Sequence, residues 1–133
     1  TRTVLDLITS GTLARHPHMR VVVPHAGSYL PLVAARLAGI SRVLVPAGMM
    51  EPVDVDEEIG RLWFDIAGDI FPTGLPALLS IADPSHVMFG ADFPYTPAPL
   101  IAARNERLMA CPELEGIRDD VMHANADRLF GLR

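Results

Sequence analysis

Two short apolar runs, each ending in one ionisable residue, constrain the fold of this chain more than any other feature. The runs are VVVPHAG at 21–27 and VMFGADFP at 87–94. Continuous apolar strands are typical of parallel sheets that are buried on both faces, and side chains at the carboxyl ends of such strands line the active-site face of α/β folds. We therefore expect His25 and Asp92 to lie at the same edge of one parallel sheet.

Segments with helical spacing alternate with these strands. The spacing of apolar residues predicts strands at 20–25, 62–67 and 86–91, a surface loop at 46–58, and helices at 2–15, 29–44, 74–83 and 97–110, with one or two short helices in 114–130. This alternation predicts an α/β fold with right-handed crossovers. Three parallel strands are few for a free-standing domain and would leave two sheet edges open.

Composition excludes several classes of partner and site. The net charge of −5 argues against nucleic acid or an anionic membrane as a partner. The single cysteine, Cys111, excludes an intrachain disulfide and fits a reducing compartment. No apolar stretch approaches the roughly 18 residues of a spanning helix, and nothing at the start resembles a signal peptide, so we expect a cytoplasmic protein. The mean hydropathy of +0.27 fits either helices rich in Ala and Leu or an apolar surface covered by something outside this chain.

The residues that end the first and third predicted strands are the candidates for chemistry. His25 can act as a general base, a general acid or a metal ligand, or it can simply hydrogen-bond a neighbouring loop. Asp92 is suited to bind a divalent ion, and its structural alternatives are a helix cap or an Asp–Arg pair. Asp65, inside the second strand, either points toward the same edge or pairs with an arginine such as Arg61 or Arg36, and we favour the structural role.

The other ionisable and aromatic residues are assigned structural roles. His16, His18, His86 and His123 fall at element ends or on helices and are expected to be solvated, whereas the expected core aromatics are Trp63, Phe64, Phe89 and Phe130. The chain has no G-x-S-x-G elbow, no phosphate-binding P-loop and no C-x-x-C pair. We also expect no H-x-H ligand pair in the chain.

Five features follow one another along the chain: SGTLARHPHMRVVVPHAGSYLP at 10–31, Arg36 eleven residues after His25, LWFDIAG at 62–68, HVMFGADFPY at 86–95 and HANADRLFGL at 123–132. In this order they resemble the C-terminal portion of the amidohydrolase-related metalloenzymes, in particular the group of aminocarboxymuconate-semialdehyde decarboxylase and the resorcylate-type decarboxylases. The family fold is a (β/α)₈ TIM barrel of roughly twice this length. The resemblance implies that residues 1–133 are a single partial domain with about strands six to eight of that barrel.

The resemblance also implies roles for the two candidate residues. Asp92 corresponds to the metal ligand of the last barrel strand, and His25 to the histidine that contacts the metal-bound water and transfers protons. The remaining ligands of the family, an H-x-H or E-x-H pair on the first strand and a histidine on a middle strand, have no counterpart here. The sequence departs from the family in Ala26-Gly27-Ser28, where two or three glycines are common, and Arg42 is out of register with the family's substrate-binding arginine.

The expected function is therefore that of a portion of a metal-dependent decarboxylase or hydrolase. Its substrate would be a small carboxylated or cyclic compound, and its cofactor a divalent ion, with Zn²⁺ expected. The 133 residues alone would be inactive, because catalytic zinc typically has three protein ligands. The expected partner is the missing N-terminal barrel half or a second copy. The alternatives are a non-catalytic half-barrel that self-associates and an unrelated small α/β binding domain.

Overall fold

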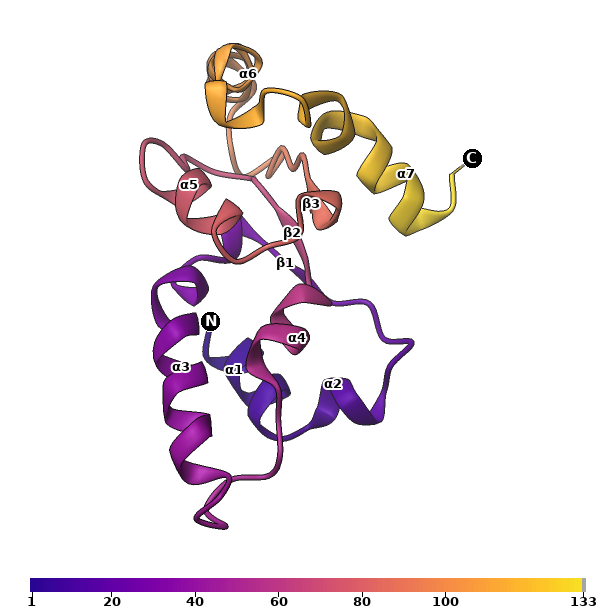
Figure 1. Cartoon of the computed structure of the whole chain (residues 1–133). Helices are drawn as coiled ribbons and strands as arrows, with labels where there is room; N and C mark the ends of the chain where they lie inside the picture. Colours follow the sequence, from indigo (N-terminus) through magenta and orange to yellow (C-terminus); the bar gives the residue numbers. More distant parts are fainter. Residues whose placement is uncertain (133) are drawn as a thin grey trace.

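The computed structural model describes residues 1–132, and its centre is a parallel sheet of three short strands (Figure 1). The strands lie in the order β1-β2-β3, and their bounds are Val22–Val23, Trp63–Asp65 and Val87–Met88. Val22 pairs with Trp63, and Phe64 pairs with Val87. The predicted α/β class and parallel sheet are confirmed, but each strand is shorter than predicted.

Helices surround the sheet on both sides. They are α1 (Arg2–Thr9), α2 (Thr12–Arg15), α3 (Leu30–Leu44), α4 (Val55–Gly60), α5 (Gly74–Leu79), α6 (Ala98–Ala110) and α7 (Asn125–Phe130). Short helical turns add η1 (His25–Gly27), η2 (Pro84–His86), η3 (Pro112–Leu114) and the π-helical η4 (Asp120–Ala124). In Figure 1, α1 to α4 gather below the strands, and α6 and α7 lie on the opposite side.

Two of the predicted elements need correction. The helix predicted at 2–15 is two helices, because Gly11 adopts a left-handed conformation at φ 67° between them. The loop predicted at 46–58 ends early, because α4 begins at Val55. Asp54 caps this helix by accepting the backbone N–H groups of Asp56 and Glu57 at 3.1 and 3.0 Å. An Asp followed three residues later by a Glu is a helix-start signal, so this helix was visible in the sequence.

The core contains most of the predicted aromatic residues. Phe64 is fully buried and Trp63 nearly so, but Phe130 is 62% exposed, and its assignment to the core was wrong. The expectation that His86 is solvated was also wrong. Its ring is half-buried, stacks on Trp63 with centroids 4.3 Å apart, and bonds the Gly60 carbonyl through Nδ1 at 3.0 Å. It thus fastens the start of β3 to the start of β2.

Asn125 fastens the C-terminal helices to β3. Its side chain is completely buried, and Nδ2 donates to the carbonyls of Pro84 and Val87 at 2.9 and 2.7 Å. Arg128 in turn donates to Asn125 Oδ1 at 3.0 Å. These bonds give a structural reason for the HANADRLFGL stretch. Within it, α7 ends at Phe130, and Gly131 closes the helix in a left-handed conformation.

None of the helices formed by residues 1–132 combines the length and the apolar character that crossing a membrane requires.

Candidate active site

His25 follows β1 in an unusual turn. The backbone φ angles of His25, Ala26 and Ser28 are 57°, 52° and 53°, and Gly27 between them is at 75°. Non-glycine residues adopt such angles rarely and at a cost, and they cluster at functional sites. The turn is closed by the N–H of Ser28, which donates to the His25 carbonyl at 2.9 Å. The His25 side chain lies exposed at the carboxyl edge of the sheet.

Asp65, the last residue of β2, holds this turn in place. Its Oδ1 accepts the backbone N–H of His25 at 3.0 Å and that of Ala67 at 3.0 Å. The favoured pairing of Asp65 with an arginine is wrong, because its carboxylate lies at the same edge of the sheet as His25 and accepts backbone amides there. Arg61 instead pairs with Glu58 at 3.2 Å. A carboxylate that accepts two backbone amides fixes the geometry of the chain on both sides of it.

Asp92 lies beyond β3, at the same edge of the sheet as His25. Beyond β3, the N–H of Phe89 donates to the Val121 carbonyl at 2.7 Å, on the side facing away from β2, while the Met88 carbonyl of the same peptide accepts the Ile66 N–H at 3.0 Å. Asp92 is half-buried at φ 58°, and its Oδ2 accepts the Thr96 hydroxyl at 2.9 Å. The Thr96 N–H also donates to the Asp92 carbonyl at 2.8 Å. Asp92 is thus held from both its backbone and its side chain.

Arg104 was missed by sequence reasoning. This residue of α6 is only 6% exposed, and its guanidinium donates to the carbonyls of Gly68 at 3.3 Å and Gly90 at 2.8 Å. Burial lowers the pKa of Arg104, and Asp65 and Asp92 oppose that shift. A signal was present, because Arg104 falls three residues after Ile101 and four before Leu108, on the apolar stripe of the helix.

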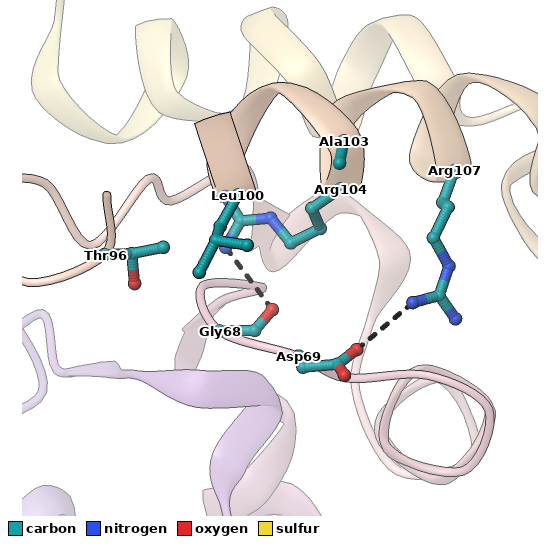
Figure 2. Close-up of a pocket in the computed structure, with 7 residues that line it drawn as sticks. All are labelled: Gly68, Asp69, Thr96, Leu100, Ala103, Arg104 and Arg107. Carbon is teal, nitrogen blue, oxygen red and sulfur yellow. Dashed lines mark hydrogen bonds and ion pairs between the residues drawn. The ribbon is translucent and has the colours of Figure 1, made fainter. Parts of the chain in front are cut away.

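A cavity of about 340 Å³ adjoins this arginine (Figure 2). Its lining consists of Gly68, Asp69, Thr96, Leu100, Ala103, Arg104 and Arg107. Arg107 faces Asp69 across the cavity at 3.4 Å and lies over the ring of Phe71, 4.4 Å from its centroid. Thr96, which bonds Asp92, connects this cavity to the candidate site.

The donor set fits part of a metal site. Asp92 offers a carboxylate whose Oδ1 has no hydrogen-bond partner in the part of the chain that the structure describes, and hard divalent ions prefer such oxygens. Within residues 1–132, no three His, Cys, Asp or Glu side chains gather closely enough to hold an ion. His16 and His18 do have H-x-H spacing, but they lie exposed in the segment between α2 and β1 and on no strand. The expectation that the chain lacks H-x-H spacing was therefore wrong, although these two histidines do not form a ligand pair on a strand.

Comparisons with known proteins agree on one family. Residues 1–132 match a family model described as amidohydrolase. A 6-methylsalicylic acid decarboxylase of Aspergillus aculeatus is 33% identical over 136 aligned positions, which cover 97% of this chain and 41% of that protein. A crystal structure of an amidohydrolase II superposes with a TM-score of 0.87 and 30% identity, over 98% of this chain and 41% of its own.

A protein of the same fold was crystallised with a metal. It is the 5-carboxyvanillate decarboxylase of Novosphingobium aromaticivorans, in complex with manganese and 4-hydroxy-3-methoxy-5-nitrobenzoic acid. Its TM-score is 0.84 at 20% identity, over 96% of this chain and 37% of that one, which shows a shared fold alone. The chain thus spans less than half the length of each of these three proteins.

Proposed function

We propose a function for this chain, which belongs to the amidohydrolase family. It carries one part of the active site, with His25 and Asp92, of a metal-dependent decarboxylase of small aromatic carboxylic acids. The observation that carries this proposal is the position of both residues at one carboxyl edge of the sheet, in a chain that is 33% identical to a 6-methylsalicylic acid decarboxylase. Hydrolysis of a small cyclic compound is the second reaction open to the same donors.

The chain supplies, in this proposal, about strands six to eight of a (β/α)₈ barrel, as a single partial domain over residues 1–133. Two observations support it. β1 and β3 each pair only with β2 among the described strands, so both sheet edges are open for further strands. The chain also matches the 6-methylsalicylic acid decarboxylase along 97% of its own length, and this match covers only 41% of the decarboxylase. The remaining ligands would come from the rest of the barrel.

Asp92 would hold a divalent ion through the carboxylate oxygen that Thr96 does not occupy. When bound, such an ion supplies positive charge that stabilises negative charge developing on the substrate. Zn²⁺ remains our expectation, and Mn²⁺ is the competing ion because a relative of the same fold was crystallised with it. The Thr96 hydroxyl fixes the rotation of the carboxylate, so that one oxygen stays directed away from its own loop.

His25 would handle the proton. When the bond between ring carbon and carboxylate breaks, CO₂ leaves and the electron pair stays on the ring carbon, which must then take up a proton. An imidazole can hold and release a proton near neutral pH. The side chain of His25 is exposed, and Asp65 fixes the backbone of the turn that carries it. The imidazole can therefore meet a substrate at the sheet edge while its backbone stays in place.

The test is decarboxylation by the complete barrel protein. It would be freed of metal with a chelator, reloaded separately with Zn²⁺ or Mn²⁺, and given 6-methylsalicylic acid and other hydroxybenzoic acids. We expect CO₂ release with at least one acid and one metal, and none from the chelated protein. Absence of CO₂ release from every pair, combined with hydrolysis of a cyclic amide or ester, would replace the decarboxylase with the hydrolase.

A non-catalytic half-barrel that self-associates is the alternative supported by the open edges of β1 and β3. Size-exclusion chromatography and metal analysis of the 133-residue chain separate the two proposals. A stable dimer without bound metal favours the half-barrel. A chain that binds metal and gains turnover only when the remaining barrel is added favours the enzyme.

A further inference from the structure

We propose that Arg104 is a positioning residue, which sets the site by bracing the loops after β2 and β3 against each other. This inference rests on the proposed function in one respect, namely that His25 and Asp92 form the site. Its structural content is independent of the reaction and can be tested without a substrate.

One guanidinium bridges the two loops. Its Nη1 donates to the carbonyl of Gly68, three residues beyond the end of β2 (Figure 2). Its Nη2 donates to the carbonyl of Gly90, two residues before Asp92. An arginine presents its donors in a rigid planar fork, so the two bonds fix the separation of the carbonyls as well as their direction. A lysine has a single nitrogen and cannot fix both bonds in the same way.

The two loops held by Arg104 lie close to His25 and to Asp65, which holds the turn at His25. A Cβ at Gly68 would lie 3.1 Å from His25 Nδ1, and a Cβ at Gly90 would lie 3.0 Å from Asp65 Cγ. Neither glycine has room for a side chain, so both loops lie close to these groups, and the bonds from Arg104 hold them there. Arg104 therefore influences the position of His25 through the loop at Gly68, and the position of Asp92 through the loop at Gly90.

Burial argues that Arg104 acts through these loops rather than on a substrate. The residue is 6% exposed, and its Nε is buried with no hydrogen-bond partner among the described residues. The ring of Phe89, with its centroid 5.5 Å from the guanidinium carbon, packs against the same group. A buried charge is costly. The cost is offset here by the two carbonyls and by the negative charge of Asp65 and Asp92.

The first test is amide hydrogen exchange of the complete protein, comparing Arg104→Met with Arg107→Met. Arg107 is a matched control, because it is an arginine one turn along the same helix but exposed and paired with Asp69. We expect the amides of Ala67 and Thr96, which bond Asp65 and Asp92, to exchange about tenfold or more faster in Arg104→Met. If both amides exchanged at the wild-type rate in that variant, Arg104 would not position the two loops, and the proposal would be overturned.

The second test separates positioning from substrate contact. Removal of groups that orient metal ligands typically costs about 10–100-fold in activity or metal affinity. We expect Arg104→Met to lower kcat or metal content by this amount with KM within about threefold of wild type, and Arg104→Lys to recover part of the loss. A raised KM with unchanged kcat and metal content would make Arg104 a substrate contact and overturn the inference.

The two proposals fail in different ways. If the wild-type protein releases no CO₂ from any acid, the proposed function fails, and the exchange rates of Ala67 and Thr96 still decide the role of Arg104. If the wild-type protein is active and Arg104→Met matches it in exchange, kcat and metal content, the brace fails and the function stands. Circular dichroism of Arg104→Met shows whether its loss reflects unfolding, and Arg104→Lys, which retains the charge, provides the same comparison if Arg104→Met does not fold.

Discussion

The backbone N–H of His25 donates to Asp65 Oδ1 at 3.0 Å, so the left-handed turn after β1 is held by the last residue of β2. The same oxygen accepts the N–H of Ala67. One carboxylate therefore links two neighbouring strand ends at the edge of the sheet where chemistry is expected. This relationship explains why a turn with three non-glycine residues at positive φ persists.

Replacement of Asp65 tests this link. Asp65→Ala leaves two backbone amides without their acceptor, and we expect the free energy of unfolding to fall by about 1–3 kcal/mol. Asp65→Asn keeps a carbonyl oxygen at the same place and should cost less than about 1 kcal/mol. Urea unfolding of the two variants measures the difference. Equal losses would mean that the charge of Asp65, and not its acceptor geometry, holds the turn.

Gly90 is expected to tolerate no side chain. A Cβ there would lie 3.0 Å from Asp65 Cγ and 3.2 Å from Oδ1, so Gly90→Ala must displace Asp65 or the loop. We expect a loss of about 1–3 kcal/mol in the free energy of unfolding. Gly39→Ala is the control, because Gly39 lies inside α3 with nothing within 4 Å of a Cβ.

The control should move in the opposite direction. Alanine in a helix interior is favoured over glycine by roughly 0.5–1 kcal/mol, so Gly39→Ala should stabilise the protein. If Gly90→Ala were as stable as wild type, the close approach of Gly90 to Asp65 would not constrain the site.

Asn125 is expected to be the most sensitive polar residue of the C-terminal helices. Asn125→Ala would leave the carbonyls of Pro84 and Val87 unpaired in the interior and open a void, at a cost of about 2–4 kcal/mol. His123→Ala, at an exposed position of η4, should change stability by less than about 0.5 kcal/mol. Thermal melting compares them, and similar midpoints would contradict the assigned role.

The thiol of Cys111 is expected to react slowly with alkylating reagents. Burial raises its pKa, and its hydrogen bond to Glu113 Oε2 at 2.9 Å acts in the same direction. Alkylation requires the thiolate, so the folded protein should react roughly tenfold or more slowly than the protein in urea.

The pH dependence of Cys111 follows from the same shift. A thiol whose pKa is higher in the folded state contributes stability that is present below the unfolded pKa of about 8.5 and is lost as the pH rises through the folded value. Alkylation of the folded protein should therefore keep accelerating above that pH. A rate equal to that of the unfolded chain, or one that levels off near pH 8.5, would contradict the shift.

The sequence predicted the parallel strands and the two residues at their ends because both depend on local pattern. An apolar run sets a buried strand, and a turn residue after it sets where its last side chain lies. The strands were predicted too long: after β1 the backbone turns left-handed at His25, and after β3 the N–H of Phe89 bonds Val121, on the side away from β2. Both causes involve backbone geometry or distant partners that apolar spacing does not encode.

The partners of the site residues were less predictable. An arginine was expected for Asp65, but two backbone amides satisfy it. Arg104 lies on the apolar stripe of its helix, and this position predicts that it is buried. Its hydrogen-bond acceptors, the carbonyls of Gly68 and Gly90, could not be predicted, because they depend on how α6 packs on loops earlier in the sequence. Phe130 fits the apolar pattern of α7 equally well and is nonetheless exposed, because its side of the helix meets no other described element.

The most direct measurement of the central claim compares Asp92→Ala and His25→Ala in the complete protein for both metal content and kcat. If Asp92 holds the ion and His25 handles the proton, Asp92→Ala loses bound metal and turnover together. His25→Ala then retains the metal while kcat falls by about 10²–10⁴-fold. Full metal content in Asp92→Ala, or near-normal turnover in His25→Ala, would contradict the account.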